Sequence, residues 1–148
     1  MLDHPETVRG RTVLDFASGS GLVGIAAAKA GAAGVTASDI DPFAGPAVAL
    51  NAALNGVDVA FDGRDLIGRD DEWQVMLVGD VFYDRGLAER LVPWFQVLRR
   101  RGTEILVGDP GRAYLPKRGL TLLGEYEVPV TRALEDAEVK RTRVWRFD

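Results

Sequence analysis

One stretch near the N-terminus constrains the fold more than any other. It covers residues 13–24 and reads VLDFASGSGLVG. An apolar run containing Asp15 leads through Gly19 and Gly21 into an alanine-rich segment, which predicts a buried strand, a tight turn and the N-terminus of a helix. Glycine at such a turn lets the backbone approach a bound molecule where a Cβ would collide with it. We therefore expect a nucleotide-like ligand at this turn.

Two classes of cofactor use a turn of this kind. Gly19, Gly21 and Gly24 match the pattern G-x-G-x-x-G, and Asp39 stands where a ribose-binding acid is expected in a dinucleotide site. Asp15 argues against a pyrophosphate, because a carboxylate beside the helix N-terminus repels its negative charges. The same carboxylate favours S-adenosylmethionine, which carries an ammonium and a sulfonium. A third interpretation also stays open, in which Asp15 only caps the turn and the glycines only allow close packing.

Composition excludes several other functions. The chain has 148 residues and a net charge of -4, which predicts one domain without the basic field that nucleic-acid binding needs. It has no cysteine and a single histidine, His4, so thiolate chemistry and a multi-histidine metal site are not expected. We see no membrane span and no signal peptide. These features favour a cytoplasmic or organelle-matrix protein.

Strand and helix patterns alternate along most of the chain. Strands are expected at residues 12–16, 34–38, 57–61, 74–78 and 103–107. Helices are expected at residues 22–30, 41–56 and 87–101, with Ser20 as N-cap of the first, Pro42 at the first position of the second, and Pro93 kinking or splitting the third. Such alternation predicts a parallel sheet with right-handed crossovers.

The C-terminal part breaks this rhythm. Residues 120–128 and 139–147 look like two strands joined by about ten residues, which is too short for a parallel return. We therefore predict an α/β, Rossmann-like fold: a seven-stranded, mostly parallel sheet with a C-terminal antiparallel hairpin and helices on both faces. A dinucleotide-binding domain typically continues to a sixth parallel strand. The predicted hairpin therefore also favours S-adenosylmethionine over a dinucleotide as the cofactor.

Together, these patterns resemble the class I, seven-β-strand, S-adenosylmethionine-dependent methyltransferases. Residues 15–21 (DFASGSG) match the first motif of that superfamily, and residues 37–42 (ASDIDP) match the second. Residues 79–84 (GDVFYD) and 108–112 (GDPGR) are most similar to the lysine methyltransferases of the electron transfer flavoprotein β-subunit, in methyltransferase family 16. The first of these resembles the Asp-x-x-Tyr motif of that group, and Asn51 and Asn55 also suit its pattern.

This resemblance implies protein-lysine N-methylation by a single domain, residues 1–148. The substrate would be a protein such as the electron transfer flavoprotein β-subunit. The net charge and the lack of a long apolar stretch predict no nucleic-acid or membrane partner. Relatives carry a further N-terminal segment with an aromatic-proline-glycine stretch that helps to cover the cofactor, and we expect this chain to lack it. Two alternatives remain: a small-molecule N-methyltransferase, and a truncated domain that binds cofactor or a partner without turnover.

The resemblance also implies a set of site residues. Asp15 would face the methionine ammonium, Asp39 the ribose hydroxyls, and Asp65 (or Asp62) the adenine amino group. Asp80 would accept hydrogen bonds from the target lysine, while Tyr83 would form part of the wall. The expected catalytic residues are Asp80 and Tyr83, and the expected cofactor-binding residues are Asp15, Ala17, Ser18, Gly19, Gly21, Asp39, Ile40, Asp65 and Asp80.

Simpler interpretations compete with some of these assignments. Asp80 could instead cap the helix that follows it, and Tyr83 could be an interface aromatic. Asp109 and Arg112 could shape the substrate mouth, or Asp109 could merely bond to its own backbone in a tight turn.

Overall fold

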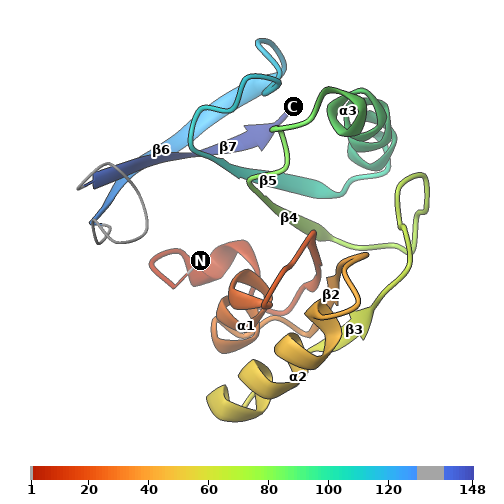
Figure 1. Cartoon of the computed structure of the whole chain (residues 1–148), viewed down its shortest axis with the longest axis vertical. Helices are drawn as coiled ribbons and strands as arrows, with labels where there is room; N and C mark the ends of the chain where they lie inside the picture. Colours follow the sequence, from red (N-terminus) through yellow and green to blue (C-terminus); the bar gives the residue numbers. More distant parts are fainter. Residues whose placement is uncertain (1, 130–138) are drawn as a thin grey trace.

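The chain forms one seven-stranded sheet with the strand order β3-β2-β1-β4-β5-β7-β6 (Figure 1). This computed structural model describes residues 2–129 and 139–148. The strands are β1 (Thr12–Phe16), β2 (Gly34–Ser38), β3 (Ala60–Asp62), β4 (Val75–Gly79), β5 (Glu104–Asp109), β6 (Leu120–Pro129) and β7 (Val139–Phe147). The α-helices are α1 (Leu22–Lys29), α2 (Ala44–Asn55) and α3 (Arg85–Arg100), and a short 3-10 turn, η1 (Pro5–Thr7), precedes β1.

The pairing of the strands confirms the predicted topology. Strands β1 to β5 pair in parallel, whereas β7 is antiparallel to both β5 and β6. Because β7 lies between β5 and β6, the hairpin extends the sheet on the β5 side. The segment that joins the two strands of the hairpin, residues 130–138, lies outside the described residues.

Each face of the sheet is covered by a different set of helices. Successive side chains of a strand point to opposite faces, so Val13 of β1 packs with α1 whereas Leu14 packs with α3. The α3 side holds the larger core, in which Phe95 is fully buried and its ring contacts Phe82, Trp94 and Phe147. The prediction of helices on both faces is therefore confirmed.

The entries to α1 and α2 differ from the predicted ones. Gly21, in the left-handed conformation, is the N-cap of α1, and no side chain caps this helix, so the assignment of Ser20 was wrong. Pro42 is not the first residue of α2, which begins at Ala44. The reason is a local turn: the Asp41 Oδ1 atom accepts a hydrogen bond from the backbone N–H of Phe43 at 2.8 Å, and Pro42 sits inside that turn.

Helix α3 runs without a break through Pro93, so the prediction that this proline could split it was wrong. Leu91 and Trp94, on either side of Pro93, are both buried in the core cluster on the α3 side, which anchors the two halves of the helix together. The helix also begins earlier than predicted. Asp84 caps it, accepting a hydrogen bond from the N–H of Leu87 at 2.8 Å.

The strand predictions were close but not exact in length. Strand β3 is shorter than expected: it covers Ala60–Asp62 and pairs with β2 at one edge of the sheet. The basic C-terminal segment lies in β7, where Arg141 and Arg143 form ion pairs with Glu125 and Glu127 of β6. Within the described residues, no helix has the length and apolar character needed to span a bilayer.

Candidate functional site

A cavity of about 250 Å³ opens at the carboxyl ends of β1, β2 and β4. In a parallel α/β sheet this edge is where ligands bind. Six of the predicted site residues line the cavity: Ala17, Asp39, Ile40, Asp65, Asp80 and Tyr83. Four others, Asp15, Ser18, Gly19 and Gly21, are not part of its lining and lie in β1 and in the turn between β1 and α1.

Backbone strain marks the same cavity. Of the non-glycine residues in the described parts of the chain, Ala17, Glu72 and Asp80 have positive φ. Ala17 and Asp80 both have φ of 55°, follow the neighbouring strands β1 and β4, and line the cavity. A residue with a Cβ in this conformation costs free energy, and such residues cluster at functional sites. Because neither residue is a glycine, the sequence alone did not predict a positive φ at Ala17 or Asp80.

The glycine-rich turn is tied to the end of β2. The backbone N–H of Gly19 donates to Asp39 Oδ2 at 2.8 Å, and the N–H of Ser18 donates to the Ser38 carbonyl at 3.0 Å. The hydroxyl of Ser18 is buried and has no hydrogen-bond partner among the described residues. An unsatisfied buried hydroxyl beside a strained turn is suited to contact a polar ligand.

Asp15 lies beneath this turn and is only 2% exposed. Its Oδ2 atom accepts a hydrogen bond from the N–H of Gly24 at 2.7 Å. A Cβ at position 24 would lie 3.0 Å from the same oxygen, which explains why the motif needs a third glycine. Burial raises the pKa of Asp15 to about 6, and the charge of Asp39 acts in the same direction. The contact between Asp15 and a ligand's ammonium stays a prediction.

Asp65 is engaged by a residue that the sequence analysis missed. Arg90 of α3 donates to Asp65 Oδ2 at 2.5 Å, and this hydrogen bond lowers the pKa of the carboxyl. Arg90 lies one helical turn after Leu87, and both side chains line the cavity. The alternative adenine ligand, Asp62, is outside the cavity lining and pairs with Arg64, which lowers the pKa of Asp62 to about 2.

Asp80 forms a two-pronged ion pair with Arg112. The Nε and Nη2 atoms of Arg112 donate to Oδ1 and Oδ2 of Asp80 at 2.6 and 2.7 Å. Asp80 does not cap α3, because that role belongs to Asp84, so the capping interpretation was wrong. Tyr83 lines the same cavity as Asp80 and is 62% exposed. The Asp80 carboxylate and the Tyr83 phenol thus both line the cavity, and the Arg112 guanidinium is bonded to the carboxylate.

The loop after β5 is anchored by a buried aspartate, Asp109. Asp109 is only 1% exposed, and its Oδ1 atom accepts hydrogen bonds from the N–H groups of Gly111 and Arg112 at 2.6 and 2.7 Å. The tight-turn interpretation of Asp109 is therefore confirmed. The same turn presents Arg112 to Asp80, so the two interpretations of this segment are compatible.

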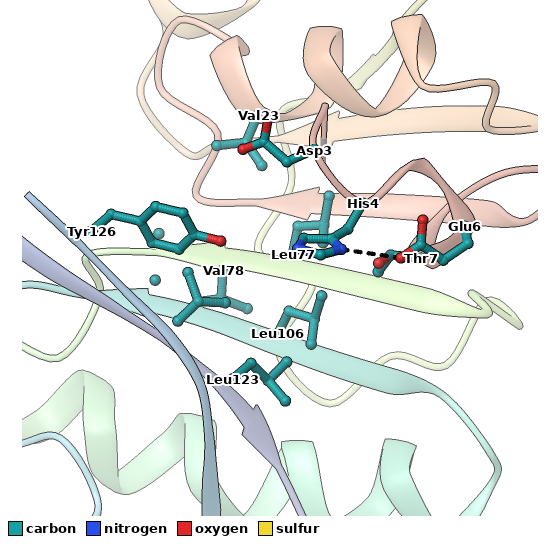
Figure 2. A pocket seen from close by; sticks show the side chains of 13 residues that line it. Asp3, His4, Glu6, Thr7, Val23, Leu77, Val78, Leu106, Leu123 and Tyr126 are labelled. Atoms are coloured by element: carbon teal, nitrogen blue, oxygen red, sulfur yellow. Dashed lines mark hydrogen bonds and ion pairs between the residues drawn. The ribbon is translucent and has the colours of Figure 1, made fainter. Parts of the chain in front are cut away.

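A second, larger cavity of about 540 Å³ lies on the α1 face of the sheet (Figure 2). Its apolar lining includes Leu77, Leu106 and Leu123, and its polar residues include His4 and Glu6, which share a hydrogen bond of 3.1 Å. No local pattern in the sequence indicates this cavity, because it is built from separate segments of the chain. It meets the first cavity only at Gly79, and none of the predicted site residues lines it.

The first cavity suits an adenosine-like ligand with a cationic end. Ile40, Leu66 and Leu87 supply apolar surface for a base, and Asp39 supplies acceptors near the glycine-rich turn. Arg64 and Arg90 also line it, but each forms an ion pair with an aspartate. The cavity thus offers a hydrophobic slot and carboxylates, the features that S-adenosylmethionine needs. No cluster of metal-ligating side chains occurs in the part of the chain that the structure describes.

The known proteins that this chain resembles in sequence are methyltransferases, in agreement with a site for S-adenosylmethionine. Residues 2–77 match the family model described as ribosomal protein L11 methyltransferase (PrmA). The electron transfer flavoprotein beta subunit lysine methyltransferase of Xenopus laevis is 40% identical over 155 residues, which cover 100% of this chain and 63% of that protein. The chain spans about 60% of the length of the five vertebrate relatives of this name that it matches.

Solved structures share the fold. Thermoplasma acidophilum 1320 superimposes with a TM-score of 0.72 at 17% identity, covering 98% of this chain and 82% of that one. Magnesium protoporphyrin IX methyltransferase from Synechocystis PCC 6803, with bound SAH, superimposes with a TM-score of 0.67 at 18% identity, covering 98% of this chain and 76% of that one. At these identities the likeness concerns the fold alone.

Proposed function

Because this chain belongs to the ribosomal protein L11 methyltransferase (PrmA) family, we propose that it is an S-adenosylmethionine-dependent methyltransferase that modifies a lysine side chain of a protein. The observation that carries the proposal is the cavity beside the glycine-rich turn, where carboxylates and strained backbone meet at one edge of the sheet. When bound there, the cofactor would supply an electrophilic methyl group on a sulfonium.

The extent of similarity favours lysine methylation of the electron transfer flavoprotein β-subunit. The Xenopus laevis relative named for that reaction matches the whole chain. By contrast, the ribosomal protein L11 methyltransferase of Xanthomonas euvesicatoria is 55% identical over 51 residues, or 34% of this chain. The residues around Asp80, Tyr83 and Arg112 lie in the part of the chain that the family model, which ends at residue 77, does not reach.

We assign the cofactor's binding to the chain as follows. Asp39 would accept hydrogen bonds from the ribose hydroxyls, and Ile40 would cover the adenine base. Asp15 would attract the ammonium group of the methionine part through its negative charge. The turn from Ala17 to Gly21 would face the methionine part. Asp65 is bound to Arg90, so it would offer only its remaining acceptor sites to the adenine amino group.

Asp80 would hold the lysine amine that attacks the methyl group of the cofactor. Its carboxylate oxygens accept hydrogen bonds from the amine, and Tyr83 forms part of the wall beside it. Alignment of amine, methyl and sulfur is the main contribution that a methyltransferase site makes, since effective concentration alone is worth up to about 7–11 kcal/mol. A cavity that opens onto the exposed rim at Tyr83 is accessible to a protein-borne side chain.

Transfer of an isotopically labelled methyl group tests the proposal. The chain is incubated with labelled S-adenosylmethionine and either the electron transfer flavoprotein β-subunit or ribosomal protein L11, and the products are sequenced by mass spectrometry. We expect label on a lysine of the flavoprotein subunit. Label on L11 alone, or only on small amines, would overturn the substrate assignment, and no incorporation at all would overturn the activity.

Substitution of Asp80 provides the matched test of the site. Asp80→Asn keeps the size of the side chain and tolerates the left-handed backbone, but removes the charge. We expect kcat/KM for the protein substrate to fall by about 100-fold or more, as for loss of a catalytic polar group. The control is Asp58→Asn, an exposed carboxylate just before β3, at the opposite edge of the sheet from the cavity. Equal activity of the two variants would remove Asp80 from the mechanism.

A further inference from the structure

We propose that Arg112 is a positioning residue for lysine methylation: its guanidinium fixes the Asp80 carboxylate and offsets its negative charge, so that the bound lysine loses its proton more readily. This inference rests on the proposed function and adds to it a role for a residue outside the cavity lining. It starts from the two hydrogen bonds of 2.6 and 2.7 Å that join the Arg112 guanidinium to both oxygens of Asp80.

The chemistry of the substrate creates the need for such a residue. A lysine ammonium has no lone pair, and its pKa lies well above neutral pH, so only a small fraction is neutral. A carboxylate within a few ångströms raises that pKa further, because it stabilises the charged form. Asp80 alone would therefore bind the lysine in its unreactive state. A guanidinium at the same place opposes this effect, since it repels the ammonium.

Proton loss must come before methyl transfer. The ammonium gives its proton to water, which leaves a lone pair on the nitrogen. That lone pair forms the new N–C bond, while the electrons of the C–S bond stay with sulfur. Arg112 engages each Asp80 oxygen once, and a carboxylate oxygen has a second acceptor position for an N–H of the neutral amine. Asp80 can thus orient the amine while it is paired.

The backbone at Arg112 is held in place by the buried side chain of Asp109. The N–H groups of Arg112 and Gly111 both donate to this carboxylate, which anchors the turn that carries the guanidinium. A planar guanidinium that meets a carboxylate through two parallel hydrogen bonds also restricts the carboxylate's rotation. Both Asp80 and Arg112 have interactions beyond this pair as well.

The ion pair is not needed merely to hold the two loops together. The backbone N–H of Asp80 donates to the Gly108 carbonyl at 2.8 Å, and that of Tyr114 donates to the Phe82 carbonyl at 3.2 Å. The first bond ties the loop after β4 to strand β5, and the second joins that loop to the loop after β5. The side-chain pair is therefore available for an electrostatic role where Asp80 lines the cavity.

Two arginines line the cavity, and each of them is paired with an aspartate other than Asp80. The titratable and charged side chains lining the cavity besides Asp80 are Asp39, Arg64, Asp65, Tyr83 and Arg90. Arg64 and Arg90 are held by Asp62 and Asp65, which offset their charges. Arg112 bonds directly to Asp80 through both carboxylate oxygens.

The dependence of kcat on pH tests the inference. Turnover of the electron transfer flavoprotein β-subunit is measured at saturating S-adenosylmethionine from neutral to alkaline pH for the unmodified chain, Arg112→Gln, Arg112→Lys and Asp80→Asn. The rising limb reports loss of the lysine proton. In Arg112→Gln we expect its midpoint to move up by about one pH unit, with a roughly tenfold lower kcat on the limb. In Arg112→Lys the charge remains and the midpoint stays close to that of the unmodified chain.

Asp80→Asn should shift the limb in the opposite direction, because the guanidinium is then left without its carboxylate. Arg118→Gln, which removes an exposed arginine from the same connecting segment, should leave the limb unchanged. Thermal melting checks that each variant is folded. An unshifted midpoint in Arg112→Gln overturns the inference, even if kcat falls. If the unmodified chain methylates no lysine, the proposed function fails, and the inference fails with it.

Discussion

At the scale of single residues, Asp15 is in electrostatic conflict with its surroundings. Burial raises its pKa from 3.8 to about 6, although the hydrogen bond from Gly24 favours the ionised form. Because the folded pKa lies above the unfolded one, the native state binds more protons between these values, and stability increases as pH falls through 6. At neutral pH the ionised carboxylate therefore destabilises the ligand-free protein, a cost that a cationic ligand would offset.

Asp15→Asn separates these two effects. An asparagine oxygen can still accept the hydrogen bond from Gly24, but it carries no charge to desolvate. We expect the free energy of unfolding at pH 7.5 to rise by on the order of 1–3 kcal/mol, while the affinity for S-adenosylmethionine falls. Urea denaturation and calorimetry measure the two quantities. The gain in stability should shrink as the pH is lowered below 6. A less stable variant at pH 7.5, or one with undiminished affinity, would contradict this account of Asp15.

Residue identities predicted which aspartates line the cavity better than they predicted the partners of those aspartates. Asp39, Asp65 and Asp80 stood out because each follows a strand of the parallel sheet. Their partners are remote along the chain: Arg90 is 25 residues from Asp65, and Arg112 is 32 residues from Asp80. No local pattern encodes such pairs, because they depend on how the loops after β3 to β5 and helix α3 come together in the fold.

At the scale of elements, α3 connects stability to the site. The helix buries one face in the larger core, and its first turns bring Leu87 and Arg90 to the cavity. Its N-terminus is held by the Asp84 side chain, which accepts from the N–H of Leu87.

Removing this cap should loosen the helix at the end near the site. We expect Asp84→Ala to lower the free energy of unfolding by about 1 kcal/mol, the usual cost of losing an N-cap. Asp84→Ser, which keeps an acceptor, should recover most of the loss. Glu89→Ala, at an exposed position of the same helix, is the control for the loss of an acidic residue. Urea denaturation compares the four proteins. Equal losses for Asp84→Ala and Glu89→Ala would show that the cap contributes nothing.

The elements themselves were largely predictable because apolar periodicity and glycine positions repeat over many residues. The end of α2 is an example: Gly56, with φ of 64°, terminates the helix where the Asn-Gly pair predicted. The helix entries were less predictable. Asp41 and Asp84 each bond to a nearby backbone N–H, and only the folded geometry shows which aspartate starts a turn and which one caps a helix.

At the scale of the whole molecule, the topology distinguishes the two cofactor classes that the glycine motif left open. The antiparallel β7 is inserted between β5 and β6, whereas a dinucleotide domain would typically continue in parallel. Ligand-dependent melting extends this distinction to binding. At a concentration 100 times its Kd, a ligand of the native state adds about 2.7 kcal/mol, which corresponds to roughly 5–10 °C for a chain of this size.

We expect S-adenosylmethionine to raise the melting temperature by such an amount and NAD to leave it unchanged at the same concentration. Differential scanning fluorimetry measures both. A shift with NAD alone would assign the cavity to a dinucleotide and remove the basis for methyl transfer.

The position of β7 also bears on how the protein is made. β6 emerges from the ribosome before β7, yet among the described strands it pairs with β7 alone. Until residues 139–147 have been synthesised, β6 has no neighbour and the outer edge of β5 stays open. The N-terminal strands can pair during translation, but β7 can pair with β5 and β6 only after residues 139–147 have left the ribosome. An unpaired edge at that stage invites association with other nascent chains.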